Sequence, residues 1–170
     1  MKISTFVIRV FRVLSLILFV LALFRTYLNL PGQVTVHYDA LGTPDGFINK
    51  TQLFYGLAIF VVVLNVLLSV LALYVPAVPV RVWRMPHRDH WRVHKRLFVE
   101  IVTHWLFTLI LLLNVFVTLS LLVLWWLNTN EKSSVQSFGW VLGLGVLLLL
   151  GWAVALPLRL SIKTTDPEEA

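Results

Sequence analysis

The chain has 170 residues, of which 59% are apolar and 13% are charged, whereas a soluble domain is roughly 45–50% apolar and about a quarter charged. This composition excludes a soluble globular fold and predicts a single membrane domain over residues 1–170. The formal charge of +6 is typical of membrane proteins with basic cytoplasmic loops, and no stripe of basic and aromatic residues indicates nucleic-acid binding.

Four apolar segments are long enough to cross a bilayer, which takes about 20 residues. They are predicted at residues 8–28, 53–75, 97–127 and 138–158. The first follows a basic start and lacks a small-residue cleavage site, so we interpret it as an uncleaved signal anchor. The predicted fold class is an all-α integral membrane protein built as a bundle of four transmembrane helices.

The basic residues predict the orientation of these segments. Eleven of the 14 Lys and Arg residues lie near the start of the first segment, between the second and the third, or after the fourth. The positive-inside rule then places both termini in the cytoplasm and residues 29–52 and 128–137 on the outer side. We therefore expect a multi-pass protein of the bacterial inner (cytoplasmic) membrane.

The polar stretch VTVHYDALGTPDGF, residues 34–47, lies in the first outer loop. Its first half alternates between apolar and polar residues, which predicts a strand that places His37 and Asp39 on the same face. A lone strand is not stable over a membrane. We therefore expect a short outer cap in which the strand pairs with another segment or lies against the ends of the spans.

The second half of this stretch predicts tight turns. Gly42 and Gly46 are expected to adopt positive φ angles, and Pro44-Asp45-Gly46 is a β-turn pattern that lets Asp45 reach back to His37. Three uses of the cap remain open: a zinc or manganese site, aspartates that only cap turns, or a recognition surface. The metal site would use His37, Asp39 and Asp45. The recognition surface would use His37, Asp39, Pro44, Asp45 and Lys50.

The longer stretch LPGQVTVHYDALGTPDGFINK resembles the signature of a family of small multi-spanning bacterial membrane proteins. This family is largely described as a domain of unknown function, and it includes the immunity protein against a secreted sporulation-delaying toxin. Thr35 stands where the family usually has Pro. The resemblance implies a multi-spanning fold and an immunity-like or sensor-like function. The matching residues are Leu30, Pro31, His37, Tyr38, Gly42, Pro44, Asp45, Phe47 and Lys50.

Residues 76–96 form a basic segment before the third span, and its RMPHRDHW stretch resembles a diverged second motif of the same family. We interpret the segment as an interfacial helix whose cations meet anionic lipid headgroups. On such a helix His87, His90 and His94 share a face, which leaves a zinc site or a pH sensor as an alternative. The predicted interfacial residues are Arg84, Arg88, Trp91, Arg92 and Arg96.

Three further features lie within the spans. Glu100 and His104 are ionisable residues near the inner end of the third span, so we expect them to face protein or water, where they would pair or relay protons. Arg25 is expected to reach outward or to meet an outer carboxylate. Small residues in the fourth span predict helix packing within the bundle or, alternatively, a homodimer contact. These are Gly139, Gly143 and Gly151.

The chain contains no HExxH motif, Walker loop or nucleophile elbow. The sequence therefore predicts a non-enzymatic membrane protein without a cofactor, whose outer motif recognises a peptide, a toxin or a partner membrane protein. One alternative is an auxiliary subunit of a larger membrane complex. Another is a small transporter or proton-coupled sensor that uses Glu100 and His104. The other expected contacts are with the lipid bilayer and its anionic headgroups.

Overall fold

The computed structural model describes residues 3–130 and 138–163. It is mostly helical, with four long helices and a hairpin between the first two. In chain order the elements are α1 (Ile3–Asn29), β1 (Gln33–Tyr38), β2 (Pro44–Asn49), α2 (Lys50–Tyr74), the 3₁₀ turns η1 (Val75–Ala77) and η2 (Val80–Val82), α3 (Arg88–Val93), α4 (Lys95–Thr129) and α5 (Gly139–Ser161).

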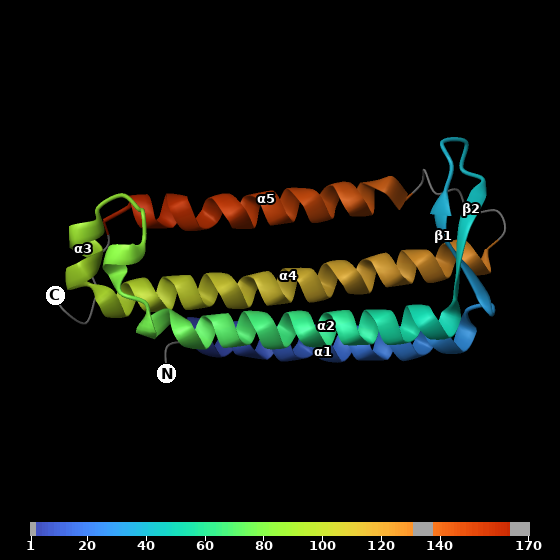
Figure 1. Ribbon diagram of the computed structural model, residues 1–170, viewed down its shortest axis with the longest axis horizontal. Helices are drawn as coiled ribbons and strands as arrows, with labels where there is room; N and C mark the ends of the chain where they lie inside the picture. Colours follow the sequence, from blue (N-terminus) through green and yellow to red (C-terminus); the bar gives the residue numbers. More distant parts are fainter. Residues whose placement is uncertain (1–2, 131–137, 164–170) are drawn as a thin grey trace.

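The four long helices are each long and apolar enough to cross a membrane, which confirms the predicted fold class. Helix α4 has 35 residues and is therefore about 52 Å long at ~1.5 Å per residue. It exceeds a hydrocarbon core of ~30 Å, so it tilts or projects from the bilayer. The hairpin lies at one end of the molecule and α3 at the other (Figure 1). Most of the expected second outer loop, residues 131–137, lies outside the described residues.

Helix α4 is the centre of the arrangement, with α1 and α2 on one side and α5 on the other (Figure 1). Helices α1 and α4 run parallel, because Thr5 contacts His104 near their starts and Ser15 contacts Asn114 further along. Helix α5 packs chiefly on α4, and most of its residues are exposed. The bundle therefore consists of three closely associated helices, with the fourth attached to one side of α4.

A buried polar contact joins α1, α2 and α4 near the middle of each helix. Asn65 Nδ2 donates to Asn114 Oδ1 at 2.8 Å, and Asn114 Nδ2 lies 3.2 Å from both Asn65 Oδ1 and Ser15 Oγ. Asn114 is only 1% exposed. Such contacts between membrane helices contribute about 0.6–2 kcal/mol. This cluster was not predicted, although Asn65 and Asn114 are the amide side chains of the second and third apolar spans and were a signal for it.

Helix α5 is attached to α4 by two tryptophans and a glycine. The rings of Trp105 and Trp152 stack with their centroids 3.9 Å apart. Each indole N–H donates to the backbone carbonyl of the other residue at 2.8 Å. Gly145 lies against the ring of Phe116, and a Cβ at Gly145 would be 2.1 Å from Phe116 Cε2. The close approach of the two helices therefore depends on Gly145.

The predicted role of Gly139, Gly143 and Gly151 in contacts within the bundle is wrong. A Cβ at any of these three positions would meet no other atom within 4 Å. The glycine that faces α4 is Gly145, which lies on a different side of the helix. A homodimer contact through the other three glycines stays a prediction.

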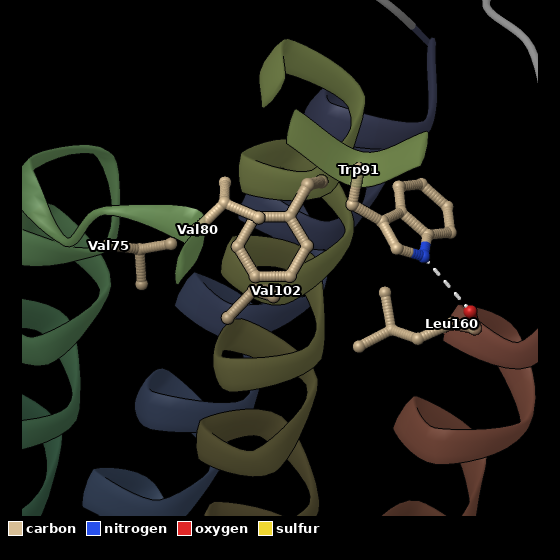
Figure 2. Packing of buried hydrophobic residues seen from close by; sticks show 6 residues of the cluster. Val75, Val80, Trp91, Val102 and Leu160 are labelled. Atoms are coloured by element: carbon tan, nitrogen blue, oxygen red, sulfur yellow. Dashed lines mark hydrogen bonds between the residues drawn. The ribbon is translucent and has the colours of Figure 1, made fainter. Parts of the chain in front are cut away.

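An apolar cluster closes the end of the molecule opposite the hairpin (Figure 2). Trp91 of α3 is fully buried in it, and its Nε1 donates to the Leu160 carbonyl of α5 at 3.0 Å. The prediction that Trp91 lies among lipid headgroups is therefore wrong, because its indole fills the space between α3, α4 and the end of α5. The buried members of the cluster are Val75, Val80, Trp91, Phe98, Val102 and Leu160.

Residues 76–96 do not form one continuous interfacial helix. His87 precedes α3 with a φ of 52°, and the helical path breaks at His94 between α3 and α4. The rings of His90 and His94 lie 4.6 Å apart, but His87 stands outside the helix, so the predicted face of three histidines is not formed. The predicted cations are exposed, and their contact with headgroups stays a prediction. They are Arg84, Arg88, Arg92 and Arg96.

Candidate functional site

The expected cap is an antiparallel hairpin of β1 and β2. The predicted strand is therefore confirmed, together with its need for a pairing partner. The predicted β-turn at Pro44-Asp45-Gly46 is wrong, because these residues begin β2. The turn lies earlier, where the Asp39 N–H donates to the Thr43 carbonyl at 2.9 Å and the Gly42 N–H donates to the Asp39 carbonyl at 3.0 Å.

Asp39 stabilises this turn through its side chain. Its Oδ1 accepts the backbone N–H groups of Thr43 at 2.7 Å and of Leu41 at 2.9 Å. The hydrogen bond from Thr43, supported by that from Leu41, lowers the pKa of the Asp39 carboxyl from its ordinary value. The stability that this carboxylate contributes is therefore present above an unfolded-state pKa of about 4 and is lost as the pH falls through the lower folded-state pKa. Gly42 has a φ of 83°, as expected.

Irregular pairing brings His37 and Asp45 together. The register shifts on both sides of His37, which faces Gly46, so Val36 and Asp45 are extra residues in their strands. Asp45 Oδ1 lies 2.5 Å from His37 Nδ1. The two side chains are 72% and 46% exposed, and exposed ion pairs contribute only about 0–1 kcal/mol to stability. The pair therefore presents polar groups on the surface and does little to hold the hairpin.

The three predicted metal ligands are not assembled into one site. Asp39 is bound to the turn, whereas His37 and Asp45 contact each other. Within residues 3–130 and 138–163, no group of three or more histidine, aspartate or glutamate side chains has an arrangement that fits a metal ion.

Position 46 needs a glycine because the two strands approach closely there, and not because the backbone has a positive φ angle. Among the glycines that the structure describes, Gly42 is the one with a positive φ, so the expectation for Gly46 is wrong. A Cβ at Gly46 would lie 2.7 Å from His37 Cβ, which is shorter than side chains tolerate. Any larger residue must therefore push the two strands apart at this point.

Replacing Gly46 with valine is expected to destabilise the hairpin by about 1–3 kcal/mol, because the new side chain collides with His37. Amide hydrogen exchange in nanodiscs will measure this as lost protection in residues 33–49 with α4 unchanged. Gly32→Val is the matched control, since a Cβ there meets no atom within 4 Å. Equal protection of the hairpin in the two variants would contradict the contact.

Asn128, near the end of α4, ties the hairpin to the bundle. The Thr35 N–H donates to Asn128 Oδ1 at 2.7 Å, and Asn128 Nδ2 donates to the Thr35 carbonyl at 3.0 Å. The side-chain amide thus pairs with the backbone N–H and carbonyl of Thr35 in β1, as the backbone of a neighbouring strand would. Val34 is fully buried next to it. The role of Asn128 was not predicted, and the available signal was a polar amide directly after an apolar span.

Two cations near the hairpin contact aromatic rings. The guanidinium carbon of Arg25 lies 5.0 Å from the centroid of the Trp125 ring. Among the described residues, Arg25 forms no ion pair with an outer carboxylate, Asp39 and Asp45 included. Lys50 Nζ lies 5.2 Å from the Tyr27 ring centroid and donates to the Leu30 carbonyl at 3.5 Å. Lys50, predicted for recognition, therefore makes contacts within the protein.

A mostly apolar pocket of about 320 Å³ lies between the hairpin, α4 and α5. Tyr38 lines it, and burial raises the pKa of Tyr38, so its phenol stays a neutral hydrogen-bond donor at physiological pH. Ser120 also lines the pocket, and its buried Oγ has no hydrogen-bond partner among the described residues. Further lining residues are Thr35, Val36, Leu124, Leu127 and Val141.

Large apolar side chains are exposed on the same hairpin. Leu41 at the turn is 87% exposed and Phe47 in β2 is 60% exposed. The hairpin end therefore combines an exposed polar pair, exposed apolar side chains and an apolar pocket. Pro44, also predicted for recognition, is exposed at the start of β2.

Glu100 and His104 belong to a separate cleft between α1 and α4, at the end opposite the hairpin. His104 Nε2 lies 3.0 Å from Thr5 Oγ1. A role of these two residues in proton relay or transport stays a prediction.

Comparison with known proteins leaves the activity open. With four helices able to cross a membrane, the fold is that of a multi-pass membrane protein. Residues 13–64 match the model of a family described as Domain of unknown function (DUF1648). This match spans most of α1, the whole hairpin and the first part of α2. No protein of curated function and no solved structure matches the chain.

Proposed function

We propose that the protein is a non-enzymatic component of the bacterial inner membrane, and that its hairpin recognises a peptide, a toxin or a partner membrane protein outside the cytoplasm. The observation that carries this proposal is the pocket of about 320 Å³ beneath the hairpin. Binding sites typically combine apolar walls with a few oriented polar groups. Here the polar residues that line the pocket are Thr35, Tyr38 and Ser120. The pair of His37 and Asp45 belongs to the same hairpin but is not among the lining residues.

The distribution of charge supports an outward-facing hairpin. The exposed cations Arg81, Arg84, Arg88 and Arg92 all lie near α3, at the opposite end of the molecule. Positive residues of short loops are retained in the cytoplasm. A ligand in the outer space, or in the outer half of the bilayer, would therefore meet the hairpin first.

The resemblance to a family that includes an immunity protein makes a secreted peptide or toxin one ligand of this kind. Such a ligand carries apolar residues that fit the pocket and backbone groups that Tyr38 and Ser120 can bind. In this proposal the exposed pair of His37 and Asp45 orients the ligand and contributes specificity. Asp39 acts indirectly, by holding the turn that carries Leu41.

Cysteine chemistry at position 41 tests both the orientation and the recognition. The chain has no cysteine, so Leu41→Cys introduces a single thiol at an exposed site. We expect a membrane-impermeant maleimide to label it in intact cells. A photo-crosslinker on the same thiol should form an adduct with one peptide or membrane protein, and His37→Ala should reduce that adduct about tenfold, which corresponds to about 1.4 kcal/mol.

Two matched variants serve as controls. Val93→Cys, at a residue in α3 that is 79% exposed, should stay unlabelled in intact cells. Labelling at position 93 and not at position 41 would show that the hairpin faces the cytoplasm. Leu147→Cys, on the exposed face of α5, reports adducts formed with lipid-exposed surfaces in general. An adduct pattern at position 41 identical to that at position 147 would contradict recognition by the hairpin.

An auxiliary subunit role is the second candidate, and the exposure of α5 favours it. Gly139, Gly143 and Gly151 would allow a partner helix to approach closely, because a Cβ at these positions meets no atom of the described residues within 4 Å. In that case a protein should co-purify in stoichiometric amounts in mild detergent. Gly143→Leu should release it, whereas His37→Ala should not.

A further inference from the structure

A cleft of about 360 Å³, lined by both charged and apolar residues, lies between α1 and α4, at the end opposite the hairpin. Thr5 and Arg9 of α1 line it, and α4 contributes Arg96, Glu100 and Thr103. These α4 positions are spaced by four and three residues, so they share one face of the helix. The cleft plays no part in the recognition proposed for the hairpin, which lies at the other end of the same two helices.

The cleft has an excess of positive charge. The guanidinium groups of Arg9 and Arg96 line the cleft together with the carboxylate of Glu100. Each guanidinium has five N–H donors in a fixed plane, so a contact within the protein leaves donors for another acceptor. Paired donors of this geometry match the oxygen atoms of a phosphate. Arg12 lies further along α1, with its guanidinium carbon 4.6 Å from the ring centroid of Phe107, which also lines the cleft.

The position of the cleft along the two spans indicates which kind of molecule supplies the phosphate. Its residues belong to the first two turns of α1 and the first four turns of α4, near the starts of both spans. Exposed apolar residues flank Arg9 in α1: Phe6 and Val7 precede it, and Val10, Val13 and Leu14 follow it. Acyl chains cover such residues in a bilayer, and the phosphates of the same lipids then lie at the level of Arg9 and Arg96.

We infer that this cleft is a specific binding site for the headgroup of one anionic phospholipid. Arg9 and Arg96 bind the phosphate, while Thr5 and Thr103 supply hydroxyl groups beside it. Glu100 accepts a hydrogen bond from a headgroup hydroxyl, which favours a lipid such as phosphatidylglycerol over one whose headgroup carries no donor. The net negative charge of this lipid matches the excess of one positive charge in the cleft.

The test measures the binding of defined lipids to the purified full-length protein by native mass spectrometry. We expect one phosphatidylglycerol molecule to be retained more tightly than phosphatidylcholine or phosphatidylethanolamine. Arg9→Gln and Arg96→Gln should each weaken phosphatidylglycerol binding about fivefold, the effect of losing about 1 kcal/mol per cation. Both side chains are exposed, so the variants should fold, and their melting temperatures without added lipid check this.

Arg81→Gln is the matched control, because it removes the same charge from an exposed residue that does not line the cleft. Its lipid binding should equal that of the unmodified protein. Equal losses in Arg81→Gln and Arg96→Gln, or no preference for phosphatidylglycerol, would overturn a specific site. Tighter binding of phosphatidylethanolamine would overturn the assignment to an anionic lipid. Competition by millimolar inorganic phosphate would show a site for soluble phosphate and overturn the assignment to lipid.

Discussion

Replacing Trp91 with alanine is expected to lower the free energy of unfolding by about 3–5 kcal/mol, the usual cost of removing a large aromatic side chain from a core. Trp91 is fully buried, and its neighbours come from η1, η2, α4 and α5. The substitution leaves a cavity between these elements. It also removes the donor to the carbonyl of Leu160, which is among the last four residues of α5 and has no partner within its own helix.

Reversible unfolding in mixed micelles will measure this effect, and two variants separate its parts. Trp91→Phe keeps most of the volume but leaves the buried Leu160 carbonyl without its donor, so it should cost about 1–3 kcal/mol. Trp140→Ala alters a tryptophan that is 65% exposed and should stay within about 0.5 kcal/mol. Equal losses in Trp91→Ala and Trp140→Ala would show that the cluster does not hold this end together.

Replacing Gly145 with valine is expected to separate α5 from α4 and to cost about 1–3 kcal/mol. The new Cβ would lie 2.1 Å from Phe116 Cε2. Because α5 packs chiefly on α4, neither α1 nor α2 compensates for the lost contact.

The distance between spin labels on α4 and α5 measures this separation, and the absence of cysteine from the chain simplifies labelling. Gly143→Val is the matched control, since a Cβ there meets no atom within 4 Å. Phe116→Ala should rescue Gly145→Ala, with a coupling energy of about 0.5–3 kcal/mol in a double-mutant cycle. Similar distances in Gly145→Val and Gly143→Val would contradict the close contact.

The membrane spans were predictable from the sequence, because their apolar length reflects the solvent that surrounds them. Each predicted segment coincides with a long helix to within about five residues at either end. The alternation of residues 34–39 likewise predicted β1. These features depend on local composition and period, which a single sequence contains.

The contact face of each helix was not predictable in the same way. In a soluble helix the apolar side faces the core, but in a membrane the lipid-facing side is apolar as well. The glycine spacing in α5 therefore suggested Gly139, Gly143 and Gly151, whereas the structure places Gly145 against α4. The burial of Trp91 was missed for a related reason, because tryptophan suits a membrane interface and a protein core equally well.

The sequence by itself determined how many helices cross the membrane, where they lie in the chain and where the polar hairpin interrupts them. Only the tertiary structure decided that Pro44-Asp45-Gly46 joins a strand, because pairing with β1 outweighed its local turn preference. It also decided that Asn65 and Asn114 meet, and that Asn128 binds Thr35. Such contacts join residues from 49 to 93 positions apart, and their geometry depends on how whole helices pack, which no local pattern specifies.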